Sequence, residues 1–184
     1  MTAPMSLHLD ERPPVARPLG VVAAFERPER VEAAVARLEA AGFEPKRLVI
    51  IAREEPSGEH LLGCGATPVG LRFWGRAGAT WTRLGECLSG GAVMVLPFLG
   101  NVVMLGPVVE WLAGDRPRHG AAEGATRLWR LLARVGVDPR VGTAIEAALR
   151  ESDILLLFAG APDERMAARA LLRDADPATR HAPA

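Results

Sequence analysis

The chain has 184 residues, enough for one ordinary domain or for one domain with an insertion. Its 22 Lys and Arg residues balance its 22 Asp and Glu residues. This neutrality argues against a general nucleic-acid binder, which needs a basic excess. Hydrophobic residues make up 49% of the sequence, which excludes wholesale disorder, and two cysteines cannot build a disulfide framework.

Both ends of the chain are expected to be flexible. In residues 1–19, Asp10, Glu11 and Arg12 stand where a secretory signal would need an apolar stretch. We therefore expect a protein that stays in the cytoplasm or on the cytoplasmic side of the inner membrane. The tail, residues 174–184, holds two prolines and is expected to dock loosely at most.

Residues 20–62 predict the first half of a ferredoxin-like domain. Val21–Phe25 is a short apolar run suited to a buried strand. A helix is predicted to begin at Pro28, where the missing N–H costs nothing, and to end at Gly42, which tolerates the left-handed conformation. Leu48–Ala52 predicts a second buried strand, and His60–Gly63 a weakly marked third one.

Residues 63–119 differ from both flanks, because 11 of the 19 glycines fall between residues 63 and 114. Within this insert, the 23 residues Cys87–Val109 carry no formal charge. A straight helix of that length would cover about 34 Å, against about 30 Å for a hydrocarbon core. Pro97–Asn101 breaks the run near its middle, and Gly106–Pro107 breaks it again. The pattern predicts an apolar glycine-rich helical hairpin.

Three environments for this hairpin stay open, namely membrane lipid, the sheet of its own chain and further copies of the chain. Pairs such as Gly75/Ala79 permit close helix packing in lipid, and tryptophans suit the headgroup zone. Soluble proteins also bury apolar runs, in their own core or between subunits of a homo-oligomer. The residues expected to mediate membrane or self-association are Trp74, Gly75, Gly78, Trp81, Gly85, Pro97, Gly100, Gly106, Pro107 and Trp111.

Residues 120–173 predict the second half of the ferredoxin-like domain. A linking helix is expected over residues 122–135, and a second helix opens at Asp138 and Pro139. Ile154–Phe158 is an uninterrupted apolar run and predicts a central strand. A last helix is expected from Pro162 to about residue 173. The expected class is thus α+β, with a βαβ(β)αβ core interrupted by the insert.

Candidate chemistry is sparse. His60 and Cys64 are four residues apart, but no third ligand clusters with them, so no metal site is predicted. Cys87 is expected to be a small buried hydrophobe. Gly63-Cys64-Gly65 begins a dinucleotide-binding pattern whose last glycine is replaced by Pro68. We expect no catalytic residues, no cofactor and a protein that is not an enzyme.

Several segments together resemble one bacterial family, the general-stress-protein (heat-induced stress protein) domain. The segments are Val21–Glu26, Ala41–Phe43, Leu48–Ile50, Phe73–Gly75, Pro97–Gly100, Gly106–Pro107 and Ile154–Gly160. The resemblance implies a membrane-associated or stress-related protein. Together with the apolar hairpin, it leads us to expect a non-enzymatic stress protein that associates with the membrane through the hairpin and has a cytoplasmic ferredoxin-like head. A soluble homo-oligomer that senses or binds a ligand is the alternative. Arg83 and Glu86, which are spaced to pair with each other, depart from the family by adding charge to the first arm.

Overall fold

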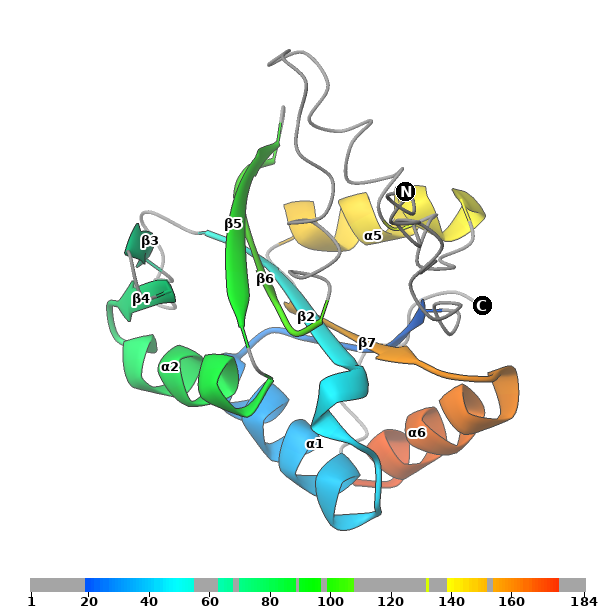
Figure 1. Ribbon diagram of the computed structural model, residues 1–184. Helices are drawn as coiled ribbons and strands as arrows, with labels where there is room; N and C mark the ends of the chain where they lie inside the picture. Colours follow the sequence, from blue (N-terminus) through cyan, green and yellow to red (C-terminus); the bar gives the residue numbers. More distant parts are fainter. Residues whose placement is uncertain are drawn as a thin grey trace, which may run out of the picture.

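The protein is an α+β fold built on an antiparallel sheet with helices on both faces, as shown by a computed structural model (Figure 1). The described residues are 19–54, 63–67, 70–88, 90–96, 99–107, 132, 139–151 and 154–175. The expected mixture of helix and strand is therefore confirmed at the level of class. The two terminal segments expected to be flexible lie almost wholly outside the described residues.

The main sheet has five strands in the spatial order β1 (Leu19–Phe25), β7 (Ile154–Ala159), β2 (Leu48–Arg53), β6 (Gly100–Leu105) and β5 (Gly91–Leu96). Every neighbouring pair is antiparallel. The first two strands of the sequence consequently run parallel to each other, and the last strand lies between them.

The connection from β1 to β2 is made by α1 (Pro28–Ala40) and a short 3-10 helix, η1 (Pro45–Arg47). As predicted, Pro28 opens α1, and Gly42 follows it with a φ of 87°. That angle is easy for glycine because it has no Cβ. One face of the helix is buried at helical spacing, by Pro28, Val31, Ala34, Val35 and Leu38.

The C-terminal half also follows the predicted order, with α5 (Pro139–Arg150), then β7, then α6 (Pro162–Ala175). Figure 1 shows α1, α2 (Gly78–Cys87) and α6 on one side of the sheet and α5 on the other. Of the linking helix expected over residues 122–135, the described part is Leu132 alone, which is helical and buried.

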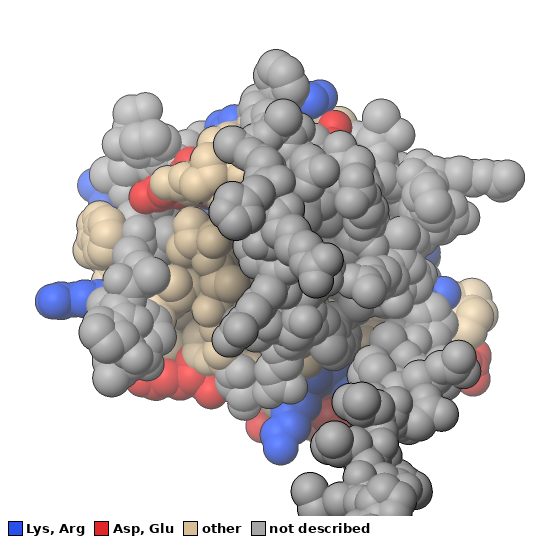
Figure 2. All heavy atoms as spheres, turned by 45° about the horizontal axis from the view of Figure 1, so that its top comes forward, with Lys and Arg blue, Asp and Glu red and all other residues tan. Residues whose placement is uncertain are grey.

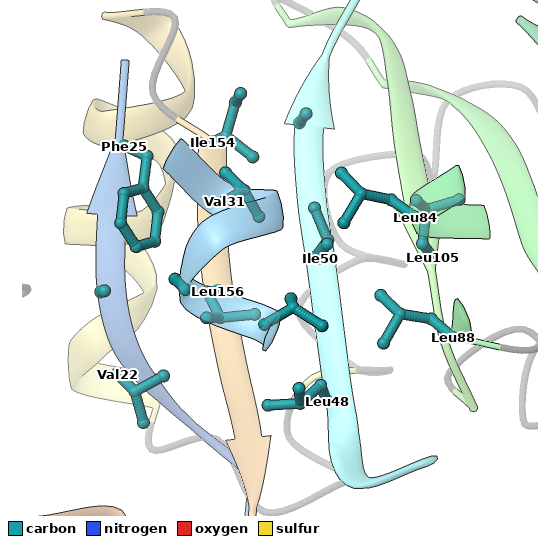
Figure 3. Close-up of a cluster of buried hydrophobic side chains, with 14 of the residues drawn as sticks. Val22, Phe25, Val31, Leu48, Ile50, Leu84, Leu88, Leu105, Ile154 and Leu156 are labelled. Atoms are coloured by element: carbon teal, nitrogen blue, oxygen red, sulfur yellow. The ribbon is translucent and has the colours of Figure 1, made fainter. Parts of the chain in front are cut away.

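Because helices cover both faces, the central strands are apolar throughout and show no alternation. In β7, Leu156 and Phe158 face the cluster under α1, α2 and α6, whereas Leu155 and Leu157 face the cluster under α5. Figure 3 shows the first cluster, in which Leu156 lies beneath α1 beside side chains of β1 and β2. The uninterrupted apolar run at Ile154–Phe158 therefore marks a doubly covered strand.

The prediction of a helical hairpin is wrong for the charge-free part of the insert. Residues Gly91–Leu96 and Gly100–Leu105 are strands that pair in register as a β-hairpin and continue the main sheet. β6 pairs with β2 on its other side. Valines at four of these positions favour extended backbone, because β-branched side chains pack well on a pleated surface.

The third strand of the expected core also differs from the prediction. The weakly marked strand at His60–Gly63 overlaps β3 (Gly63–Thr67) by one residue, and residues 60–62 lie outside the described part. β3 pairs with β4 (Gly70–Trp74) in a separate two-stranded sheet. Short apolar runs identify a strand without identifying its partner, so the position of this hairpin was not foreseeable from the pattern.

Candidate association surface

Trp81, one of the residues expected at a membrane interface, is instead part of the core. It lies on α2, is 1% exposed, and stacks on Phe73 of β4 with ring centroids 6.2 Å apart. Its indole N–H has no hydrogen-bond acceptor among the described groups. The large aromatic area that α2 and β4 bury together offsets that unmade bond.

Two of the small residues expected to mediate association, Gly78 and Gly85, serve close packing within the chain. A Cβ placed on Gly85 would lie 3.5 Å from the Phe73 ring and 4.0 Å from Leu105, so this face of α2 lies on the sheet. At Gly78, a Cβ would lie 3.3 Å from the backbone oxygen of Phe73. Gly75 precedes the helix and has a φ of 97°, which permits the turn from β4 into α2.

Among the described residues expected at the interface, Trp74 is a large apolar residue that lies in solvent, with 53% of its surface exposed. Residues alternate along a strand, so Trp74 shares the outer side of β4 with the exposed Arg72, and the exposed Arg76 follows in the turn. The register places Gly63 and Gly65 of β3 opposite Trp74 and Arg72. Because glycine has no side chain, these two positions of β3 cannot cover Trp74 and Arg72. Arg72, Trp74 and Arg76 are called the Trp74 surface below.

The described charged residues do not form a single-sign field on the face of the molecule that Figure 2 shows, because blue and red residues are mixed there. This mixing agrees with the zero net charge of the chain. Any attraction to an anionic partner must therefore come from local arginines.

Arg83, expected to pair with Glu86 on its own helix, pairs instead with Glu32 of α1. Two bonds of 2.5 and 2.9 Å join its guanidinium to the carboxylate, and a further bond of 3.2 Å reaches Thr80. The hydrogen bond from Arg83 lowers the pKa of Glu32. This cross-helix pair attaches α2 to the body of the protein, and it accounts for a charge in an otherwise apolar arm.

The remaining expected residues lie at the ends of β6. Gly100 and Gly106 have φ angles of 75° and 104°, and Pro107 follows in a turn. A Cβ on Gly106 would lie 2.3 Å from the backbone oxygen of Leu48, so only glycine fits there. The Gly106 N–H donates to the Gly90 carbonyl at 3.1 Å. Pro97 and Trp111 lie outside the described residues.

The chain's own sheet buries one half of the charge-free segment. Val102, Val103, Met104 and Leu105 of β6 are each 0% exposed. β5 is only partly buried, and Val95 has 71% of its surface exposed at the edge of the sheet. For β6, the expectation that burial requires lipid or sister subunits is therefore wrong.

One polar cluster has no counterpart in the sequence interpretation. Arg47 makes two bonds of 3.0 and 2.7 Å to Glu164, donates to the carbonyl of Ala159 at 2.8 Å, and stands 4.5 Å above the Phe158 ring. Glu164 also accepts the N–H of Ala161 at the start of α6. The ion pair joins residues 117 positions apart, so no local spacing could have revealed it. Its groups satisfy one another, which indicates a structural role.

The prediction that Cys87 is buried is wrong, because this residue lies exposed at the end of α2. Desolvation raises the pKa of its thiol, and the Glu39 carboxylate adds to the effect. The thiol is accordingly less reactive than an ordinary one. Within the described ranges, no three His, Cys, Asp or Glu residues are grouped so that they could hold a metal ion. None of the helices described there combines the length and hydropathy needed to cross a bilayer.

Comparison with known proteins gives no family for the chain: no family model matches it, and no curated protein or solved structure matches it significantly. The resemblance to the general-stress-protein domain stays a prediction.

Proposed function

We propose that the protein is a non-enzymatic, stress-related protein that associates with the cytoplasmic side of the inner membrane through the Trp74 surface. The contact is peripheral, and the partner is a bilayer with anionic headgroups. The exposure of Trp74 between two exposed arginines is the observation that carries the proposal. The stress-related part rests on the sequence resemblance alone.

The chemistry of the Trp74 surface suits an interface between water and lipid. An indole has an apolar body and one N–H donor, and it prefers the headgroup zone. Arginines beside it are attracted to anionic headgroups and donate hydrogen bonds to phosphate oxygens. On the inner side of β4, Leu71 and Phe73 pack against the core. This packing fixes the position of the strand that carries Arg72 and Trp74.

The expected strength of the contact follows from the exposed area. A Trp side chain buries about 200 Å² when covered, so covering the exposed half removes about 100 Å² from water. At about 25 cal/mol per Å², this contributes up to about 2.5 kcal/mol, or about 60-fold in partition. Each arginine near an anionic surface adds about 1 kcal/mol, or about fivefold.

Co-sedimentation of the full chain with vesicles tests this proposal. We expect binding to phosphatidylcholine vesicles that contain phosphatidylserine, and weaker binding to phosphatidylcholine alone or in high salt. Trp74→Ala should lower the partition coefficient by at least tenfold, and Arg72→Gln or Arg76→Gln by about fivefold each. Met166→Ala is the matched control, because Met166 is also an exposed apolar residue, at 64%, on the distant helix α6.

Two results would count against this function. The first is that the intact chain does not bind anionic vesicles at low salt. The second is that the Trp74→Ala and Met166→Ala variants bind these vesicles equally well. Circular dichroism of each variant separates a lost contact from a lost fold.

We also infer that the head is a variant of the ferredoxin-like plan. The parallel strands β1 and β2 are joined by α1 with β7 inserted between them, and α6 returns beside α1 on the same face. This split βαβ unit followed by an antiparallel strand and a helix supports the inference. In this interpretation β5 and β6 extend the sheet at its far side.

A further inference from the structure

The two edges of the main sheet are built differently. β1 has a register shift between Val21 and Ala23, and the Arg165 side chain approaches Gly20 closely. Bulges and charged side chains are devices that discourage an edge strand from pairing with another chain. The opposite edge, β5, pairs with β6 over six residues without a shift. Its sequence, GAVMVL, contains no charge and no proline.

Part of the β5 edge is occupied by the chain itself, because β3 and β4 both contact β5. Leu71 of β4 lies so close to Gly91 that a Cβ there would meet it at 2.6 Å. Val93 is partly buried against the cluster that contains α2. At the outer end, Val95 is 71% exposed. Among the described residues of β5, the exposed apolar side chain is therefore Val95, and the strand around it is neutral.

We propose that two copies of this chain associate through their β5 strands, which pair antiparallel about a two-fold axis at Met94 and form one continuous sheet. The occupant is a second copy because the strand complements itself. Val93 and Val95 flank Met94 symmetrically, so a two-fold axis places each Val95 opposite Val93 of the second copy. With no charge on either strand, two identical edges meet without repulsion.

This register also keeps the faces of the two sheets continuous. A two-fold axis perpendicular to the sheet pairs residues on the same face, and Val93 packs on the face covered by α1, α2 and α6. Val95 lies on that same face, because residues two apart in a strand point the same way. Directly opposed side chains lie about 5 Å apart, so Val93 of the second copy covers the exposed Val95.

Sedimentation velocity of the full chain without detergent tests the association. The expected species has twice the 19.6 kDa mass of one chain. Val95→Lys should raise the dissociation constant at least tenfold, while circular dichroism stays unchanged because the residue is exposed within one copy. Met166→Lys, the same change at another exposed apolar residue, should leave the mass unchanged. A single-chain mass for the intact protein would overturn the proposal, as would an equal effect of both variants.

A cross-linking experiment tests the register in a chain whose Cys64 and Cys87 are replaced by serine. Met94→Cys would place two thiols directly opposite, with Cα atoms about 4.5–5.5 Å apart, within the range for a disulfide. Ala92→Cys would leave them roughly 13 Å apart. We expect oxidation to cross-link the first variant and not the second. Cross-linking at residue 92 alone, or at neither position, would overturn the Met94-centred pairing.

Both experiments are independent of the membrane proposal. The Trp74 surface lies on β4 and the following turn, whereas the Met94 pairing involves the outer part of β5. A chain that dimerises without binding vesicles, or binds vesicles as a single copy, would separate the two proposals.

Discussion

Replacing Leu105 by alanine should destabilise the protein strongly, because this residue anchors the charge-free segment in the core. Leu105 is 0% exposed and lies between β2 and β5, opposite Ile50 and Gly91. Figure 3 shows it pointing into the same cluster as Leu84 and Leu88 of α2.

The size of the effect follows from what surrounds Leu105. Leu→Ala changes in cores cost about 2–5 kcal/mol, and the cost grows with the cavity that remains. Two of the neighbours are glycines, Gly85 and Gly91, which have no side chain to relax into the space. We therefore expect a loss in the upper part of that range, about 3–4 kcal/mol of unfolding free energy.

Urea unfolding followed by circular dichroism measures this loss. With an m-value of about 2 kcal/mol per molar urea, the midpoint should fall by about 1.5–2 M. Met166→Ala, at an exposed helix position, should change the unfolding free energy by less than about 0.5 kcal/mol. A cost below about 1 kcal/mol for Leu105→Ala would refute the reasoning, since the side chain would then not be close-packed in the sheet.

Two further predictions concern the connections of this segment. Gly106→Ala should cost at least about 2 kcal/mol in the same urea assay, because a Cβ would collide with a backbone oxygen of β2 at a φ of 104°; no loss would contradict the observed turn. For Glu32, whose folded-state pKa is lowered by Arg83, the stabilisation is present above its ordinary pKa of 4.5 and is lost as pH falls through the lowered value. Intact protein should therefore have a higher unfolding midpoint than Glu32→Gln at pH 7 and an equal one in strong acid; a difference that grows in acid would contradict the ion pair.

Local signals in the sequence were sufficient for the elements of the two outer segments. Pro28 and Gly42 delimit α1 as predicted, because proline and glycine have specific roles at helix ends. The strand at Ile154–Phe158 was identifiable from its uninterrupted apolar run. These features act within a few residues, so the sequence displays them directly.

The charge-free segment was misinterpreted because burial on both faces removes the alternation that marks a strand. In β6, Val103 and Leu105 face one cluster while Val102 and Met104 face the other. The signal for a β-hairpin was nevertheless present: valine-rich runs on both sides of a short turn that contains glycine. The hydropathy and length of the same segment favour a membrane helix and conflict with that signal.

The candidate site was foreseeable only in part. The sequence predicts the same interface role for Trp74 and Trp81, yet Trp74 is exposed and Trp81, seven positions later, is buried. Periodicity does not indicate which side of α2 faces the sheet until the partner strands are known. The bonds from Arg83 to Glu32 and from Arg47 to Glu164 depend on tertiary structure and have no local signature.

The central claim is that Gly91–Leu96 and Gly100–Leu105 are paired strands inside the main sheet of their own chain. Backbone chemical shifts and cross-strand nuclear Overhauser effects of the isotope-labelled full chain test it most directly. The account predicts extended-strand shifts, with contacts between Val103 and both Ala52 and Val93, which the register places opposite it. Helical shifts over residues 91–96 and 100–105, without those contacts, would contradict it.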